Sequence, residues 1–489
     1  MSGRKIMIVG AGFAGRSLAQ EIATKGILGK VSAFLDDDPE KIDTVLDGIP
    51  VAGPIKEAKT LRQRFPSDEA IISIPSADNN RLACIYGYLK EAGFTKIQIL
   101  PSLSQIIDGS AHLIQTREID PQDLLGRTPV AIPLKESLRY VKGKRVLISG
   151  AGGSIGSELS RQLLSGGAER LYLFGHGENS IYEIDQELRL LQEEGVGEKA
   201  TIVPVVGDLQ DSDFVRFIMN RLKADVVFHC AAYKHVPMVE SNPVAAISNN
   251  VFGTKNLVEA AAACGVSRFV FISTDKAVDP ISIYGTSKLI AEHLVLSSNG
   301  GSTAFMVVRF GNVLGSRGSI VPLFRKQILK GGPVTVTHPG ASRFFMTIPE
   351  AASLVLKTGG VGSGNSLYIL DMEEPIRIRD VAEQMIRFYG YTPDQEVPIR
   401  YIGLRPGEKV HEKLWKSRQK PIFTEHKRIL EMPDVEIDTG SLGALLEDLE
   451  PVCFFSRTQP ASYRNRRVLR ERLLRYVPTL ELPEDEPEY

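Results

Sequence analysis

The chain has 489 residues, of which 43% are hydrophobic and 24% charged, and 58 Lys and Arg residues against 59 Asp and Glu residues give a formal net charge of -1. This length predicts two to four domains of roughly 100–200 residues each, and the balanced charge argues against a strongly basic nucleic-acid binder. There is no apolar run of about 18 residues, so no transmembrane helix is predicted. Four scattered cysteines without a CxxC pair indicate reduced thiols in a cytoplasmic protein, and no metal site is expected.

The first predicted element is a strand over residues 5–9, followed by a glycine-rich turn and a helical pattern that runs to residue 22. Further strands at 31–35, 70–74 and 96–100 alternate with helical stretches, which predicts a small α/β domain over residues 1–115. The glycines have the spacing of a dinucleotide loop, and an acid follows the second strand. The residues of this candidate second nucleotide site are Gly10, Gly12, Gly15 and Asp36.

Residues 116–143 show neither a sustained period nor a bias toward Gly, Ser or Pro, so we interpret them as a packed connector. A second strand, glycine turn and helix begin at residue 144, and strands alternate with helices over residues 144–315. Shorter elements over 316–435 predict a smaller α+β substrate lobe, and residues 436–489 predict a C-terminal helix with an acidic tail. The predicted fold is α/β, with two Rossmann-like doubly wound parallel-sheet domains.

The turn of the second unit, at residues 150–156, has the spacing of a cofactor loop. Its glycines let the backbone turn tightly and approach a pyrophosphate, while the N-terminus of the next helix presents free N–H groups to the anion. The next strand ends at Gly175 and His176 without the acid that NAD enzymes often place there. The expected cofactor is NADP or NAD, with NADP slightly favoured. The loop residues expected to hold it are Gly150, Gly153, Ser154, Ile155 and Gly156.

Tyr284 and Lys288 are four residues apart, so a helix would place both on one face. A lysine ammonium favours the phenolate form of a nearby tyrosine, and such a tyrosine can take a proton from a sugar hydroxyl. The run Thr274-Asp275-Lys276 ends the preceding predicted strand, at the edge of a doubly wound sheet where ligands bind. Its acid and its amine can serve as general acid and general base. These residues predict a nicotinamide-dependent redox site.

The motifs at 150–156, 272–280 and 284–288 together resemble the nucleotide-sugar 4,6-dehydratases of bacterial polysaccharide biosynthesis. Those are extended short-chain dehydrogenases/reductases that act mostly on UDP-N-acetylglucosamine, and the likeness covers residues 117 to about 432. It implies C4 oxidation by Tyr284 and Lys288, C5 deprotonation by Lys276 and protonation of the departing C6 hydroxyl by Asp275. The likeness also implies a homo-oligomer.

Further contacts are expected around the two ligands. Cofactor contacts beyond the loop are expected from His176, Asp208, Leu209, Ala231, Ala232, Tyr284 and Lys288. The UDP-sugar is expected to meet Lys234, Asn312, Arg317, Arg343, Arg405 and Glu408. Arginines suit a diphosphate because the planar guanidinium can bond two oxygens at once.

Two other functions stay open. A nucleotide-sugar epimerase shares the fold, the cofactor and the tyrosine–lysine pair, but it usually has small hydroxyl residues where Asp275 and Lys276 stand. A non-catalytic dinucleotide sensor would keep glycine loops but has no reason to keep Tyr284, Lys288 and the acid–amine pair together. The dehydratase is therefore preferred.

Overall fold

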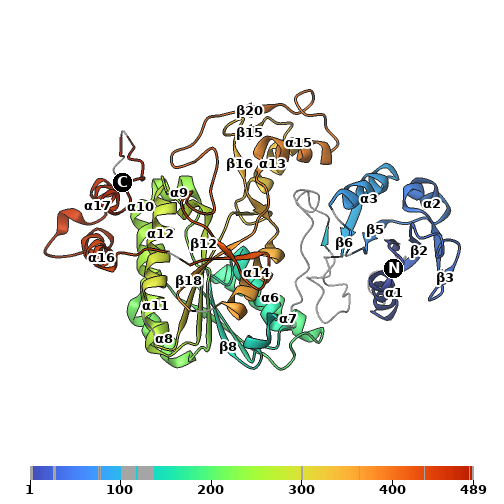
Figure 1. The fold of residues 1–489 in the computed structure, drawn as a ribbon. Coiled ribbons are helices and arrows are strands. Elements are labelled where there is room, and N and C mark those ends of the chain that lie inside the picture. The colour runs from blue at the N-terminus through green and yellow to red at the C-terminus, as the bar shows by residue number, and fades with distance from the viewer. Residues whose placement is uncertain are drawn as a thin grey trace. The chain divides into compact units, whose positions relative to one another are not determined.

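The computed structural model describes residues 4–25, 29–74, 76–77, 79–100, 117–118, 137–298, 301–362, 364–433, 435–483 and 485–486. It divides into two compact units, Met1–Pro133 and Leu134–Tyr489 (Figure 1). Most of the predicted connector 116–143 lies outside the described residues. Among the helices in the described ranges, none is both long enough and apolar enough to cross a bilayer.

The first unit contains a seven-stranded sheet in the order β3-β4-β2-β1-β5-β6-β7, in which β4 to β6 run parallel and the two edge strands antiparallel. Its elements are β1 (Lys5–Val9), α1 (Phe13–Lys25), β2 (Lys30–Leu35), β3 (Val45–Leu46), β4 (Ile49–Gly53), η1 (Ile55–Glu57), α2 (Ala58–Arg64), β5 (Glu69–Ile72), α3 (Asn79–Glu91), β6 (Lys96–Ile99) and β7 (Arg117–Glu118). Successive strand residues point to opposite faces, so Met7 and Val9 pack with α2 and α3 while Ile6 and Ile8 pack with α1.

The second unit contains a nine-stranded sheet in the order β10-β9-β8-β11-β12-β13-β18-β22-β21. The strands are β8 (Arg145–Ser149), β9 (Arg170–Gly175), β10 (Thr201–Val206), β11 (Val226–His229), β12 (Arg268–Thr274), β13 (Ala304–Phe310), β18 (Ser366–Leu370), β21 (Ile422–Phe423) and β22 (Ile429–Met432). The seven strands from β10 to β18 are parallel, and the order reverses on the two sides of β8. The predicted α/β class with parallel Rossmann-like sheets is confirmed.

Helices cover both faces of this second sheet. They are η5 (Arg139–Val141), α6 (Ser154–Ser165), α7 (Glu178–Glu193), α8 (Ser212–Leu222), α9 (Val236–Ser241), α10 (Pro243–Ile247), the π-helical η6 (Ser248–Phe252), α11 (Gly253–Ala263), η7 (Asp275–Ala277), α12 (Ile283–Ser297) and α14 (Ile348–Val361). Helices α8, α11 and α12 pack side by side over one face, and α6 contacts α14 over the other (Figure 1). Burial on both faces explains why the strands are almost continuously apolar.

Short elements follow β13 and extend beyond the sheet. They are β14 (Asn312–Val313), α13 (Ile320–Leu329), β15 (Val334–Val336), β16 (Ser342–Arg343), β17 (Phe345–Met346), β19 (Ile376–Arg377), α15 (Ile378–Phe388) and β20 (Ile399–Tyr401). Three two-stranded sheets join β14 to β17, β15 to β20 and β16 to β19. Strand pairing therefore ties together segments that are far apart in the sequence.

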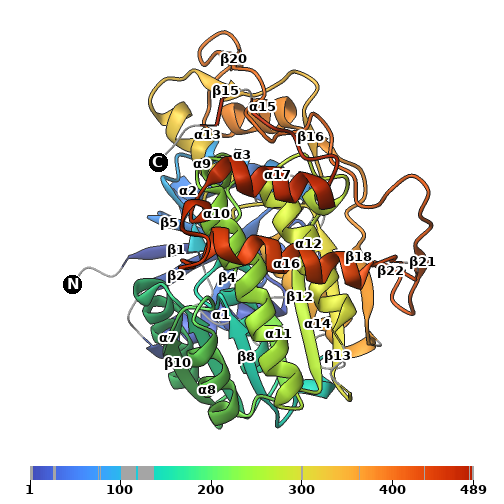
Figure 2. The same ribbon diagram turned by 90° about the vertical axis from the view of Figure 1, so that its left-hand side faces the viewer.

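The last part of the second unit contains two helices, where the sequence predicts one. These are α16 (Thr439–Cys453) and α17 (Arg466–Tyr476), separated by η8 (Pro460–Ser462). Both contact α10, and α16 also contacts α12 (Figure 2). Beyond α17, the Thr479 hydroxyl donates to the carbonyl of Pro280 at 2.7 Å and the Glu481 amide donates to that of Ile281 at 3.1 Å. This segment therefore holds the loop that enters α12.

Candidate active site

The glycine turn between β8 and α6 leaves a surface of bare backbone. Gly150 has a φ of +68°, and a Cβ there would lie 2.8 Å from Ala231 Cα. A Cβ at Gly156 would lie 2.2 Å from the carbonyl oxygen of Gly150. Side chains are excluded at both positions. The Gly153 N–H donates to the Gly150 carbonyl at 2.9 Å, so the N–H groups left to meet a ligand are those of the first turn of α6.

A cavity lies above this turn, where the strand order reverses between β8 and β11. Several residues predicted to hold the cofactor line it, namely Gly150, Gly153, His176, Leu209, Ala231 and Ala232. Of the other predicted contacts, Ser154, Ile155 and Gly156 lie in the first turn of α6, and Asp208 accepts the Gln210 amide hydrogen bond at 2.9 Å. No Asp or Glu is among the described residues that line the cavity. The donor-rich, carboxylate-free lining fits an anionic dinucleotide.

Arg317 lies at this cavity, although it is predicted as a substrate contact. Its guanidinium donates to the carbonyl of Gly152 at 3.0 Å and to the Glu183 carboxylate at 2.9 Å, and its backbone N–H donates to Ser154 Oγ at 3.0 Å. A segment that follows β14 in the chain therefore lies against the glycine turn.

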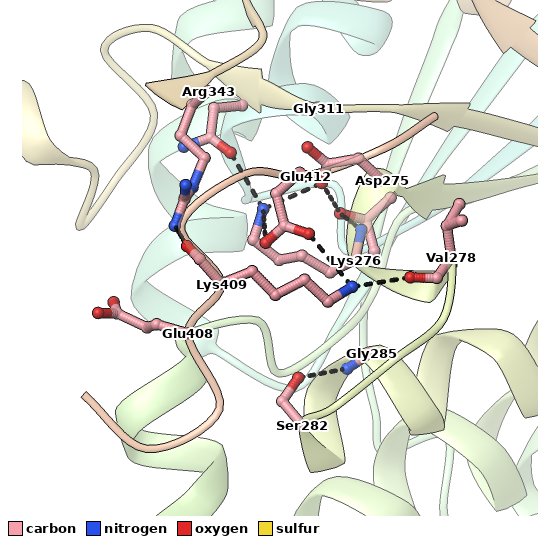
Figure 3. Close-up of polar contacts among 12 residues, drawn as sticks. Asp275, Lys276, Val278, Ser282, Gly285, Gly311, Arg343, Glu408, Lys409 and Glu412 are labelled. Carbon is pink, nitrogen blue, oxygen red and sulfur yellow. Dashed lines mark hydrogen bonds and ion pairs between the residues drawn. The ribbon is translucent and has the colours of Figure 1, made fainter. Parts of the chain in front are cut away.

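The predicted acid and amine meet at the end of β12. The Asp275 side chain is fully buried, and its Oδ1 accepts hydrogen bonds at 3.0 Å from both Lys276 Nζ and the Thr274 hydroxyl. Lys276 Nζ also donates to Asn312 Oδ1 at 3.1 Å. Asp275 Oδ2 has no hydrogen-bond partner in the described part of the chain, and Gly311 lies beside it (Figure 3). An unpartnered buried carboxylate oxygen is costly, so Asp275 Oδ2 keeps an unused capacity to accept a hydrogen bond.

Tyr284 and Lys288 lie in the first two turns of α12, which begins where Ser282 Oγ accepts a hydrogen bond from the Gly285 amide at 3.1 Å (Figure 3). Lys288 Nζ donates to the carbonyl of Ile272 at 2.6 Å, and burial lowers the pKa of Lys288 to about 7. Burial raises the pKa of Tyr284, and the charges of Asp275 and Glu412 act in the same direction, whereas a hydrogen bond with Thr274 opposes them.

Glu412 and Lys409 also belong to this cluster, although neither is among the predicted site residues. Glu412 Oε1 lies 3.9 Å from Lys276 Nζ, and Glu412 Oε2 lies 3.4 Å from Lys409 Nζ. Lys409 Nζ in turn donates to the carbonyl of Val278 at 2.7 Å (Figure 3). Both residues stand in a charged run, and such a run usually forms a solvated surface.

The other predicted substrate contacts lie in different settings. Arg343 is buried and donates to the carbonyls of Ser342, Lys409 and Val410 at 2.7–2.9 Å. Arg405 is exposed and pairs with Glu408, with its Nε 3.0 Å from Glu408 Oε1. Lys234 Nζ donates to Ser316 Oγ at 3.4 Å. Arg343 thus holds the segment that carries Lys409 and Glu412.

The glycine turn of the first unit has a comparable backbone. Gly10 has a φ of +103°, and a Cβ at Gly15 would lie 2.0 Å from the carbonyl oxygen of Gly10. Asp36 lies beside this turn because β1 and β2 are parallel neighbours. Its carboxylate accepts hydrogen bonds from the Ala11 amide at 2.7 Å and the Asp38 amide at 2.9 Å. A Cβ at Gly12 would meet nothing within 4 Å.

The chain is similar in sequence to known proteins of polysaccharide biosynthesis and nucleotide-sugar chemistry. Residues 146–434 match the family described as "Polysaccharide biosynthesis protein". The probable polysaccharide biosynthesis protein EpsC of Bacillus subtilis is 42% identical over 412 residues, which are 84% of this chain and 68% of EpsC. The UDP-N-acetylglucosamine 4,6-dehydratase (inverting) of Campylobacter jejuni is 32% identical over 275 residues, which are 55% of this chain and 77% of that protein.

Similarity also extends to an epimerase and to a solved structure. The UDP-glucose 4-epimerase of Rickettsia rickettsii is 32% identical over 284 residues, which are 56% of this chain and 79% of that protein. The X-ray structure of Pen from Bacillus thuringiensis matches with a TM-score of 0.53 and 35% identity, and the match covers 61% of this chain and 90% of that one.

Proposed function

Because the chain belongs to the polysaccharide biosynthesis protein family of nucleotide-sugar dehydratases and epimerases, we propose that it is a 4,6-dehydratase. The substrate proposed is a UDP-N-acetylhexosamine, in the first place UDP-N-acetylglucosamine, and the product its 4-keto-6-deoxy derivative. The observation that carries the proposal is the buried acid–amine pair, in which Lys276 Nζ lies 3.0 Å from Asp275 Oδ1. An epimerization does not remove water, so it has no leaving hydroxyl for Asp275 to protonate.

The proposed cofactor is a nicotinamide dinucleotide held at the glycine turn of β8 and α6. The bare backbone at Gly150 and Gly156 and the carboxylate-free lining support this placement. His176 in the lining favours a 2′-phosphate, so NADP is the preferred form. When bound there, the dinucleotide supplies the acceptor that takes a hydride from C4 and returns it to C6.

The acid–base steps follow from the protein side chains. In its phenolate form Tyr284 takes the proton of the C4 hydroxyl as C4 is oxidised, and the resulting ketone acidifies the proton on C5. A proton transfer from Lys276 to Asp275 along their hydrogen bond yields a neutral amine and a carboxylic acid. The amine then takes the C5 proton while the C6–O bond breaks, and the acid protonates the leaving hydroxyl. One water leaves, and the pair is then ammonium and carboxylate. As the hydride returns to C6, the Lys276 ammonium, whose protons exchange with solvent, gives a proton back to C5.

The test is to incubate the purified protein with UDP-N-acetylglucosamine and NADP+ or NAD+ in heavy water. Mass spectrometry should show the loss of one water, and NMR should show deuterium at C5. A product of unchanged mass favours the epimerase, and tight dinucleotide binding without turnover favours the sensor. Water loss without deuterium at C5 would refute the role of Lys276 as the base.

A further inference from the structure

The acid–amine pair has a third charged neighbour that the proposed steps do not use. The Glu412 side chain is 3% exposed, and its two oxygens lie between two ammonium groups, 3.9 Å from that of Lys276 and 3.4 Å from that of Lys409. Among the described residues, no group donates a hydrogen bond to Glu412 Oε2. Figure 3 shows the carboxylate between the two lysine side chains, next to Asp275.

The position of Glu412 is fixed by neighbouring backbone rather than by its own partners. Strand β16 holds the segment 409–411, because Arg343 donates to the carbonyls of Lys409 and Val410 and the Ser342 amide donates to that of Val410 at 3.1 Å. Ser342 Oγ also lies 2.8 Å from His411 Nδ1. These bonds hold the backbone next to Glu412, and its carboxylate is buried beside Lys276.

We propose that Glu412 is a positioning residue for the elimination step, which orients Lys276 and holds a negative charge beside its amine. This inference rests on the proposed function. A negative charge about 4 Å from an ammonium stabilises the protonated form, and burial weakens the screening of that interaction. With Asp275 on one side and Glu412 on the other, Lys276 can lose its proton to Asp275 and regain one from C5.

Other charged or titratable groups around Glu412 influence whether its carboxylate is charged. Asp275, Lys276 and Tyr284 face it from η7 and α12, Lys409 from its own segment and Arg343 from β16. Burial raises the pKa of Glu412 and the Asp275 charge adds to this, whereas the charges of Lys276, Lys409 and Arg343 oppose them. Lys409 is the second cation beside Glu412 and offsets part of its negative charge. Removing Lys409 is therefore expected to act on Lys276 in the opposite sense to the loss of Glu412.

The experiment compares the pH dependence of deuterium incorporation at C5 in three variants. In Glu412→Gln the negative charge beside the Lys276 amine is lost, so the acid limb of the profile should move to lower pH, with a lower plateau. In Lys409→Met the limb should move to higher pH, and in Glu412→Asp it should stay near the wild-type position. Glu447→Gln, which removes the same charge from an exposed position of α16, is the control and should leave the profile unchanged.

The readouts separate this inference from the proposed function. If the wild-type protein neither loses water nor exchanges C5 hydrogen, the proposed function fails. If it does both, and the limb stays in place in Glu412→Gln or moves the same way in Lys409→Met, only the role of Glu412 is overturned. Dinucleotide binding and thermal unfolding show which variants fold. If Glu412→Gln does not fold, the shift of the acid limb in Lys409→Met tests the role of Glu412: a shift to higher pH supports it, and any other result overturns it.

Discussion

At the residue scale, the site contains an amine whose charge can change near neutral pH. Lys288 is buried, its Nζ donates to a backbone carbonyl at 2.6 Å, and its pKa is about 7. The ring of Phe271 lies 3.8 Å from the same nitrogen. We propose that the charged form of Lys288 favours proton loss from Tyr284, which lies four residues earlier on α12, and that the neutral form does not.

The depressed pKa of Lys288 makes the stability of the protein depend on pH. Between pH 7 and about 10.4 the unfolded chain keeps the proton that the folded chain has lost, so the free energy of unfolding should rise with pH by up to about 1.4 kcal/mol per unit. Lys288→Met removes this pH-dependent contribution to the free energy of unfolding. Urea unfolding at pH 7, 8 and 9 should show the wild-type free energy climbing relative to that of the variant. If the difference in free energy of unfolding between the wild type and the variant stays constant with pH, the buried lysine is not neutral in the folded protein.

Lys276 is expected to act in elimination and not in cofactor binding, because its contacts are Asp275, Asn312 and Glu412 and it is absent from the cavity lining. Lys276→Ala should lower the rate of water loss by at least about 10²-fold, the usual contribution of a general base. Dinucleotide affinity, measured by fluorescence titration, should stay within a factor of about two. Full dehydration by this variant would remove the residue from the mechanism.

At the element scale, the parallel strands explain how much of the site the sequence predicts. Apolar runs mark the strands, and the carboxyl ends of parallel strands share one edge, so Gly150 and Asp275 are predictably close. Glu412 is not predictable in this way, because β16 and its pairing partner β19 have two residues each and show no period. Its placement depends on hydrogen bonds between residues about 70 positions apart.

The segment after β14 is expected to help bind the cofactor, since Arg317 lies at the cavity rather than among the acid–amine groups. Arg317→Ala should weaken dinucleotide binding about 10–100-fold, as expected for the loss of a charged hydrogen bond. Arg325→Ala, on the exposed side of α13, is the matched control. A variant that binds the dinucleotide normally but has a raised KM for the UDP-sugar would restore the substrate role predicted from the sequence.

At the scale of the whole molecule, two glycine turns occur in two separate units, and each has its own hydrophobic core. The second turn follows β8 and the acid–amine pair follows β12, so both lie at the same edge of one parallel sheet. In the first, Asp36 accepts hydrogen bonds from backbone N–H groups, and two of the acids that follow β2 pair with Lys41, whose Nζ lies 3.6 Å from Asp36 Oδ2 and 3.0 Å from Asp38 Oδ2. We propose that the first unit binds a nucleotide without taking part in the chemistry.

Calorimetric titration of the full chain with NADP+ and with UDP-N-acetylglucosamine tests this second site. We expect one of the two probes to show a binding event that is lost in Gly12→Asp and kept in Gly12→Ala. Both substitutions have space, because a Cβ at Gly12 meets nothing within 4 Å, but only the carboxylate repels a phosphate. Identical isotherms for the wild type and Gly12→Asp with both probes would exclude a phosphate site at this turn.

The segment around α17 has a consequence for the order in which the protein matures. Glu240 accepts the amide hydrogen bond of Ile283 at 2.7 Å and is itself held by Arg470 at 2.9 Å, while Thr479 and Glu481 bond the loop at 280–281. A ribosome makes residues 470–481 nearly two hundred positions after that loop. A nascent chain can therefore complete its cofactor cavity well before the entrance to α12 is secured, and catalytic competence is expected to be among the last properties acquired during synthesis.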